Sequence, residues 1–366
     1  IDRGHAVRWA TAPDACRRLE ASGIDTIEVG PTFDDLRVTY FRRYPEVLSL
    51  APADLPEFTF PRLFGEVAVE MMLDGVLAAA RAWRPDLVVA DSAAFAGLIA
   101  AAAIGVPSVA HSFGALTPRH RVEAAAGRQD KFWRSAGVEP RPFGGTYDGL
   151  YLDIYPPSLQ TAAMDHVPHR QPLRPVAFDE VAGDTTTVWP ADGDDRPLVY
   201  LTLGTVFRGA GLLPVACGAI ASLDVRLLVT VGPAGDPAQL GSQPANVRVE
   251  RYVPQTRVFD ECVVVASHAG SGTFLAALAR GIPQLCMPQA ADQFLNAAGC
   301  AASGVGLTLL PEEAVGEAIA TAVDRLLRED AFRARAAEVA AEIRAMPGPS
   351  DVAAILEASM SPPTDA

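Results

Sequence analysis

The sequence predicts an α/β protein with two similar halves, each built on a parallel β-sheet. Short apolar runs alternate with alanine-rich stretches of helical character, which is the pattern of strands joined by crossover helices. This alternation stops at an acidic stretch rich in Thr and Gly, residues 179–196, and then begins again. A length of 366 residues also suits two domains better than one.

In the first half we expect strands at 6–10, 86–90 and 108–110. The second of these leads into Asp91 and a helix over 93–104. Residues 112–150 are rich in Arg, Gly and aromatic residues, and we expect them to form loops and helices around a pocket. The opening residues read as the end of a helix, so we expect the first strand and helix of this domain to precede Ile1.

In the second half we predict five strands that are apolar along most of their length, at 198–203, 226–231, 247–252, 263–267 and 284–287. Strands of this kind are covered on both faces. Helices are expected at 312–328, 331–345 and 351–360. The predicted organisation is a first domain at 1–178, a linker at 179–196, a second domain at 197–345 and a final helical segment at 346–366.

The composition excludes several classes of partner. The formal net charge of −14 argues against nucleic acid or an anionic membrane surface. No apolar run reaches the length of a membrane span, which argues against stable membrane insertion. The five cysteines are scattered without a CxxC pair, as in a reduced, cytoplasmic protein. A phosphate group would therefore be bound by backbone N–H groups and a few side chains.

The segment 262–298 is the most informative part of the chain, because it combines a buried strand, a glycine-rich turn and a helix. His268 ends the strand, and Gly270-Ser271-Gly272-Thr273 opens the helix. A helix start carries unpaired N–H groups, and glycines let a diphosphate approach them closely. The alternative for His268 is a buried, hydrogen-bonded structural histidine. The adjoining glycines favour an anion site, although the spacing matches neither a Walker A motif nor G-x-G-x-x-G.

Asp292 and Gln293 follow the next strand of the same half. They could cap a helix, or they could bind two adjacent sugar hydroxyls, because a carboxylate accepts hydrogen bonds and an amide both donates and accepts. Their position past a strand end, in the same half as His268, favours the sugar. An anion site followed by such a pair suits a nucleotide sugar.

Other strand ends carry weaker signals. Gly204 and Thr205 could approach a phosphate, but alone they read as a simple turn. At 252–255, Tyr252 could stack on a nucleobase, the backbone of Val253 could pair with the base edge, and Gln255 could reach the ribose or base. Packing of the aromatic ring over a proline turn is equally compatible with this segment.

In the first half, Asp91 could cap the helix that follows or orient a catalytic base. His111 also ends a strand and could line an acceptor pocket or only pack. Five large side chains suggest a bulky, hydrophobic acceptor, although each could equally be core: Phe64, Phe95, Phe113, Phe132 and Trp133. The sequence contains no His, Cys and Asp spacing typical of a metal site, so neither a metal nor another cofactor is expected.

Together these residues resemble the GT-B glycosyltransferases that decorate bacterial natural products. The resemblance is carried, in the family's order and over most of the chain, by residues 85–109, 155–160, 201–205, 252–255 and 267–297. The last of these, SHAGSGTFLAALARGIPQLCMPQAADQFLNA, is highly specific, and the others support it.

The resemblance implies two Rossmann-like domains that face each other across a cleft, the first for the acceptor and the second for the nucleotide sugar. It implies that the nucleotide is bound by Gly204, Thr205, Tyr252, Val253, Gln255, His268, Gly270, Ser271, Gly272 and Thr273. It implies donor-sugar contacts from Asp292 and Gln293, and the first half would offer His111 and Phe113 to the acceptor. The final helix would cross back to the first domain.

The implied reaction is metal-independent, inverting transfer of a sugar, expected to be a dTDP-linked deoxysugar, to a hydroxyl group of a hydrophobic natural product. The family's catalytic base is a His expected upstream of Ile1, and Asp91 matches the Asp that orients it. Ala269 stands where the family commonly has Gly, and its methyl group should fit if its φ is negative. Two alternatives are a sugar-nucleotide epimerase of the same fold and a catalytically silent auxiliary protein. The sequence does not set the oligomeric state.

Overall fold

The computed structural model describes the chain except for residues 178–187, 190–192, 205–210, 234 and 361–366. It contains two compact units, which are described separately below. The first unit consists of Ile1–Ile154, Ala162–Leu173 and Pro347–Ala366, and the second of Tyr155–Thr161 and Arg174–Met346. The chain therefore passes between the units at four points. Most of the linker expected at 179–196 lies outside the described residues.

The first unit contains a four-stranded parallel sheet of order β3-β4-β5-β6. Its strands are β3 Val88–Asp91, β4 Ser108–His111, β5 Tyr151–Asp153 and β6 Arg170–Pro172. A second, two-stranded parallel sheet joins β1 Trp9–Thr11 to β2 Thr26–Glu28. The strands expected near 6–10, 86–90 and 108–110 are present with ends shifted by one to three residues.

The helices of the first unit are α1 Pro13–Ala21, α2 Phe33–Arg43, η1 Pro45–Ser49, α3 Leu55–Thr59, the π-helical η2 Phe60–Ala68, α4 Val69–Trp83, α5 Phe95–Ile104, α6 Arg119–Ala126, α7 Asp130–Ser135, η3 Pro142–Gly145 and α14 Pro349–Met360. The all-apolar α5 packs with α4 on one face of the sheet, around Phe95 and Ile99. On the other face, Val352 of α14 packs with Val109 and Leu152.

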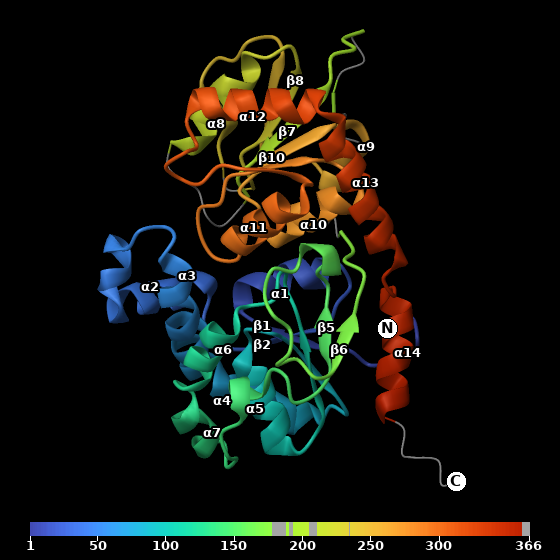
Figure 1. Ribbon diagram of the computed structural model, residues 1–366. Helices are drawn as coiled ribbons and strands as arrows, with labels where there is room; N and C mark the ends of the chain where they lie inside the picture. The colour runs from blue at the N-terminus through green and yellow to red at the C-terminus, as the bar shows by residue number, and fades with distance from the viewer. Residues whose placement is uncertain (178–187, 190–192, 205–210, 234, 361–366) are drawn as a thin grey trace. The chain divides into compact units, whose positions relative to one another are not determined.

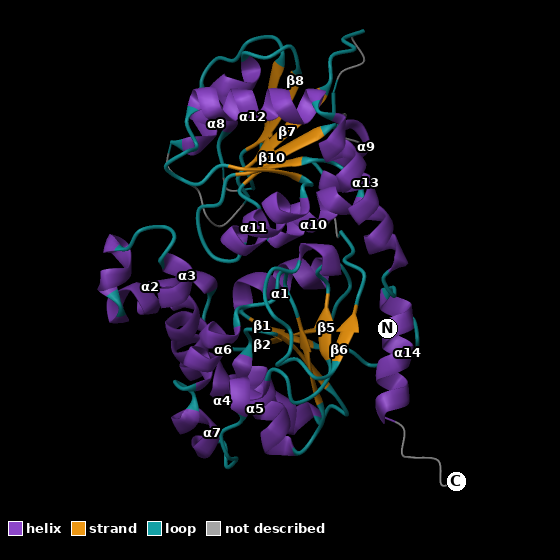
Figure 2. Ribbon diagram, in the orientation of Figure 1, coloured by secondary structure: helices purple, strands orange, loops and turns teal. Residues whose placement is uncertain are grey.

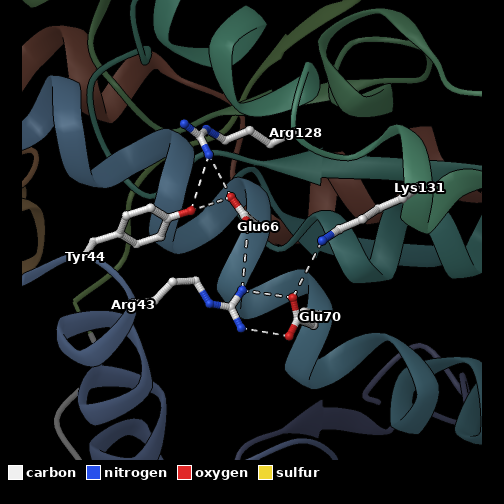
Figure 3. A network of polar contacts seen from close by, with 6 residues as sticks. All are labelled: Arg43, Tyr44, Glu66, Glu70, Arg128 and Lys131. Carbon is white, nitrogen blue, oxygen red and sulfur yellow. Dashed lines mark hydrogen bonds and ion pairs between the residues drawn. The ribbon is translucent and has the colours of Figure 1, made fainter.

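A network of charged side chains joins α2 to η2, α4 and the α6–α7 segment (Figure 3). Its members are Arg43, Tyr44, Glu66, Glu70, Arg128 and Lys131. Arg43 donates from both Nη atoms to Glu70, at 2.9 and 2.8 Å. Glu66 Oε2 accepts from the Tyr44 hydroxyl at 2.6 Å and from Arg128 Nη1 at 2.7 Å. These contacts tie four helical segments together through half-buried charges.

The second unit contains a six-stranded parallel sheet of order β12-β11-β10-β7-β8-β9. Figure 1 labels three of its strands, β7, β8 and β10. Its strands are β7 Leu198–Thr202, β8 Arg226–Thr230, β9 Val247–Glu250, β10 Val264–Ser267, β11 Gln284–Cys286 and β12 Gly306–Thr308. The order reverses between β7 and β10, the first strand and the fourth of this half. In doubly wound sheets, ligands bind outside the carboxyl ends of the strands at such a switch point.

Helices cover both faces of this sheet (Figure 2). They are η4 Pro157–Leu159, α8 Leu212–Ala221, η5 Pro237–Leu240, α9 Gln255–Glu261, α10 Ser271–Ala279, α11 Gln293–Ser303, α12 Gly316–Arg328 and α13 Asp330–Ala345. Alternate residues of β7 enter opposite cores. Leu201 packs with α8 and α12, whereas Tyr200 packs with α9 and α10. This burial on both faces explains why the strands are apolar along their length.

Candidate active site

His268 follows β10 directly, at the switch point of the second unit. Its half-buried ring lies between two glycines. An added Cβ would lie 2.6 Å from the ring at Gly204 and 2.5 Å from it at Gly270, so neither position accepts a side chain. Nδ1 is buried and has no hydrogen-bond partner within the described part of the chain. Burial lowers the pKa of His268 to about 4, so the ring is neutral at pH 7.

The first turn of α10 lies next to this ring. Gly270 is the N-cap residue, and its backbone is extended, with φ −62° and ψ 138°. Glycine has no side chain to satisfy the first N–H groups of the helix, and the space beside Gly272 is open to at least 4 Å. The structure therefore places a glycine-lined helix start, whose N-cap residue has no side chain, beside a neutral imidazole, which is an arrangement that can bind an anion.

Ala269 differs from the sequence expectation. Its φ is +63°, in the left-handed region, and not negative as its fit was expected to require. The residue is fully buried, its N–H donates to Ser267 Oγ at 3.0 Å, and its carbonyl oxygen accepts from Asn296 Nδ2 at 2.9 Å. These two hydrogen bonds hold a backbone conformation that glycine would adopt more easily.

Asp292 precedes α11 and reaches back to α10. Ser271 Oγ donates to its Oδ2 at 2.6 Å, and Asn296 Nδ2 donates to the same oxygen at 3.2 Å. Burial raises the pKa of this carboxyl group, and the hydrogen bond from Ser271 opposes the rise. Asp292 is the N-cap residue of α11, as the capping alternative expected, but its side chain makes no cap hydrogen bond to that helix.

Gln293 is buried, and its amide oxygen accepts from the backbone N–H groups of Gln289 and Ala290, at 2.8 and 3.0 Å. It therefore fixes the turn after β11, in which Ala291 has a φ of +55°. This contact defines the position of the side chain, and a sugar contact from its amide remains a prediction.

Hydrogen bonds connect several polar side chains near the carboxyl ends of β7 and β8. Gln255 Nε2 donates to Thr273 Oγ1 at 2.9 Å and lies 3.4 Å from the Tyr200 hydroxyl. The Tyr200 hydroxyl lies 2.7 Å from Thr230 Oγ1, which in turn bonds Thr202 Oγ1 at 3.0 Å. Gln255 thus links the start of α9 to the first turn of α10. Its ribose or base contact remains a prediction.

Of the remaining residues expected at the nucleotide, Tyr252 is 39% exposed and Val253 is buried. Tyr252 lies two residues after β9, and its stacking on a base remains a prediction. Gly204 has a φ of +73°, which only glycine adopts readily. Thr205 lies outside the described residues.

In the first unit, Asp91 ends β3 and is exposed. Its Oδ1 accepts from the Ala93 N–H at 2.8 Å, and α5 begins only at Phe95, with Ala94 as N-cap. Asp91 therefore caps the turn before the helix and not the helix itself, which corrects the capping alternative. In register, Asp91 pairs with His111 on β4, so the two side chains point to the same face of the sheet.

The large side chains suggested for an acceptor divide into two groups. Phe95 and Trp133 are buried in the core of the first unit, and Phe132 is 8% exposed there. Phe64 and Phe113 are partly buried and pack against that core. The core alternative is therefore correct for the first three, and an acceptor contact remains a prediction for Phe113 and His111.

Sequence reasoning missed Asn296, Tyr200, Thr202 and Thr230 as parts of this site. For Asn296 a signal existed, because a residue four positions after Asp292 lies on the same face of a helix. For the other three, the sequence shows only polar residues inside strands. Among the described residues there is no group of three or more His, Cys, Asp or Glu residues that could hold a metal ion.

Comparison with known proteins assigns the family. Residues 2–204 match the family described as Erythromycin biosynthesis protein CIII-like, N-terminal domain, and residues 215–359 match the corresponding C-terminal domain. The chain belongs to this family of glycosyltransferases. No helix in the described part of the chain is both long and apolar enough to cross a membrane.

Individual relatives and solved structures show a similar relationship. Elloramycin glycosyltransferase ElmGT of Streptomyces olivaceus is 35% identical over 371 residues, which cover 99% of this chain and 92% of that protein. The crystal structure of SnogD from Streptomyces nogalater is 29% identical, with a TM-score of 0.75 over 98% of this chain and 92% of that one. Spinosyn rhamnosyltransferase SpnG, also solved with thymidine diphosphate, is 27% identical, with a TM-score of 0.78 over 97% and 93%. The fold is therefore GT-B, with two Rossmann-like units, and the protein is a glycosyltransferase.

Proposed function

We propose that this glycosyltransferase transfers a deoxysugar from a thymidine diphosphate sugar to a hydroxyl group of a hydrophobic natural product, with inversion and without a metal ion. The observation that carries the proposal is the neutral imidazole of His268, whose Nδ1 has no hydrogen-bond partner among the described residues, beside the glycine-lined start of α10. Negative charge develops on the diphosphate as it leaves, and this site offers N–H groups to receive it.

Each second-unit residue has a distinct role in this proposal. His268 and the N–H groups of 271–273 bind the diphosphate, with Gly204 and Gly270 allowing its close approach. Tyr252 stacks on the base, and the backbone of Val253 pairs with the base edge. Asp292 and Gln293 bind hydroxyl groups of the donor sugar. Solved SpnG with thymidine diphosphate and the relative named TDP-daunosamine transferase DnrS support thymidine as the nucleoside.

In the first unit, Asp91 holds and stabilises an imidazole that acts as the general base. The base removes the proton of the acceptor hydroxyl, the oxygen attacks the anomeric carbon from the face opposite the diphosphate, and the C–O bond to the diphosphate breaks. The configuration at that carbon is therefore inverted. The exposed carboxylate of Asp91, whose Oδ1 already accepts the Ala93 N–H, supports an orienting role. SpnG solved with spinosyn aglycone supports a hydrophobic acceptor.

The test is product formation by the full-length protein. Thymidine diphosphate sugars are incubated with a panel of polycyclic aromatic and macrolide aglycones, with and without EDTA, and products are identified by mass spectrometry and anomeric NMR couplings. We expect an inverted glycoside and the same rate with EDTA. A converted sugar nucleotide without glycoside would indicate an epimerase instead. Nucleotide binding without any product across the panel would favour a silent auxiliary protein. Loss of activity in EDTA, with recovery in Mg²⁺, would contradict metal independence.

A further inference from the structure

Asn296 is a fully buried polar side chain next to the proposed donor site. It lies four residues into α11, and its residue exposure is 0%. Its Nδ2 faces three oxygen atoms: the Ala269 carbonyl at 2.9 Å, Ser271 Oγ at 3.0 Å and Asp292 Oδ2 at 3.2 Å. A carbonyl oxygen and a carboxylate oxygen can only accept, so the atom that faces them is the amide nitrogen and the orientation of the amide is fixed.

These three acceptors belong to the two parts of the proposed donor site. The Ala269 carbonyl and Ser271 belong to the turn that opens α10, where the diphosphate is proposed to bind. Asp292 belongs to the start of α11, where the sugar is proposed to bind. Ser271 Oγ also donates to Asp292 at 2.6 Å, so the three side chains form a closed triangle of hydrogen bonds.

The Ala269 backbone requires such support. Its φ of +63° is unfavourable for an L-residue with a Cβ atom, and the hydrogen bond from Asn296 to its carbonyl oxygen helps to hold it there. The amide oxygen of Asn296, by contrast, is buried and has no partner within the described part of the chain. Burial of an unpaired amide oxygen costs free energy. Among the described residues, the side-chain hydrogen bonds of Asn296 all come from its Nδ2 atom.

We propose that Asn296 is a positioning residue that fixes Asp292 and the 269–271 turn relative to each other, so that the sugar and the diphosphate of the donor are bound as one unit. This inference rests on the proposed function of the second unit. Asn296 itself touches neither ligand in the proposal. It sets where the carboxylate of Asp292 points, and it keeps the first N–H groups of α10 directed at the diphosphate.

Asn296→Asp gives the sharpest test, because it keeps the size of the side chain and replaces the donor by a second carboxyl group. At neutral pH, that group would face the carboxylate of Asp292 and the Ala269 carbonyl oxygen without a proton to donate. Two carboxyl groups at this distance share one proton as the pH falls, which restores a donor. The other titratable side chain of this turn is His268, whose pKa near 4 keeps it neutral throughout a titration from pH 8 to 5.5.

The probes are thymidine diphosphate and thymidine diphosphate-glucose, titrated by calorimetry into the full-length protein. For Asn296→Asp at pH 7.5 we expect the dissociation constant of the nucleotide sugar to rise by about tenfold or more, the size of losing one hydrogen bond to a charged group. The constant for thymidine diphosphate should rise less. At pH 5.5 most of the loss should be recovered. Asn296→Ala should show the loss without the pH-dependent recovery.

Ser303→Ala is the matched control, since Ser303 lies at the far end of the same helix and donates only to carbonyl oxygens of α11. It should bind both probes as the unchanged protein does. Thermal unfolding of every variant separates a folding defect from a local one. Unchanged binding in Asn296→Asp, or equal loss for both probes at every pH, would overturn the positioning role. Absence of glycoside formation by the unchanged protein, with these binding differences intact, would overturn the proposed function alone.

Discussion

Two turns of the molecule have the same place in the fold and opposite chemistry. One joins β10 to α10 in the second unit, and the other joins β3 to α5 in the first. Each follows a strand of a parallel sheet and leads into an apolar helix. The first presents the neutral ring of His268 and uncapped glycine backbone. The second presents the carboxylate of Asp91, which accepts an N–H group of its own turn.

This difference shows how the residue at the carboxyl end of the strand selects the charge that the turn can receive. A carboxylate at position 268 would repel a diphosphate, and its oxygens would compete for the N–H groups of α10. At position 91 the carboxylate already uses a local N–H, and its negative charge suits a protonated imidazole.

Asp91→Asn should have the largest effect. The substitution keeps the shape but removes the charge that orients and stabilises the base, so kcat should fall by about 10²–10⁴-fold. The dissociation constant of thymidine diphosphate should not change, because the nucleotide residues lie in the second unit. Steady-state kinetics and calorimetry measure the two quantities. Asp86→Asn, at the other end of the same strand segment, is the control and should retain full activity. A fully active Asp91→Asn would reduce Asp91 to its role in the turn.

His268→Ala should weaken binding of thymidine diphosphate by about 1.5–3 kcal/mol, the range for a hydrogen bond to a charged group. Calorimetric titration gives the value directly. His169 is exposed in the first unit, and His169→Ala should bind the nucleotide normally. Equal affinity in both variants would remove His268 from the diphosphate site and would leave the two turns chemically alike.

The pH dependence of stability should also report on His268. Its pKa of about 4 in the folded protein lies below the ordinary value of 6.5, because burial disfavours the charged ring. The unfolded chain therefore takes up the proton first, and the contribution of this group is complete above pH 6.5 and lost as the pH falls toward 4. Between pH 7 and 5 the loss should be about 2 kcal/mol.

Urea unfolding at pH 7 and pH 5 measures this contribution. His268→Gln should lose about 2 kcal/mol less than the unchanged protein over this interval, since glutamine does not titrate. His169→Gln serves as the control and should follow the unchanged protein. If all three proteins lose the same stability, the ring at position 268 is not kept neutral by burial.

Ala269→Gly should have the smallest effect. Glycine relieves about 1–2 kcal/mol of left-handed strain, which offsets the lost methyl group and the greater freedom of the unfolded chain. The free energy of unfolding should therefore stay within about 1 kcal/mol of its original value. Ala266→Gly, at a fully buried position of β10, gains no such relief and should cost about 1–2 kcal/mol. Equal losses in the two variants would show that the turn at 269 stores no strain.

The same two turns show how far the sequence predicts the structure. The strand before His268 and the helix from Ser271 were predicted to within one residue, because apolar runs and glycines act locally. At Asp91 the following helix starts two residues later than expected, at Phe95, because the carboxylate bonds Ala93 and fixes a turn first. Competition of this kind between a cap and a turn depends on geometry that spacing alone does not give.

Long-range polar contacts could not be predicted from the sequence for a different reason. The positive φ of Ala269 depends on Asn296, which is 27 residues away along the chain. The bonds among Tyr200, Thr230 and Thr202 depend on the register of two parallel strands. The sequence does not distinguish aromatic residues that line a pocket from those that fill a core. The structure places Phe95 and Trp133 in the core.

The four passages of the chain between the units bear on the construction of hybrid enzymes. Residues 155–161 precede 162–173 of the first unit but fold with the second, where Tyr155 and Leu159 pack so closely on Gly299 that an added Cβ would lie 2.6 and 2.8 Å from them. A chimera joined at a single point after residue 174 would pair this segment of one parent with α11 of the other. Parents that differ at 155 or 299 would then clash or leave a cavity. Exchange of donor specificity between relatives therefore requires two grafts, 155–161 and 174–346, while 347–360 stays with the first unit.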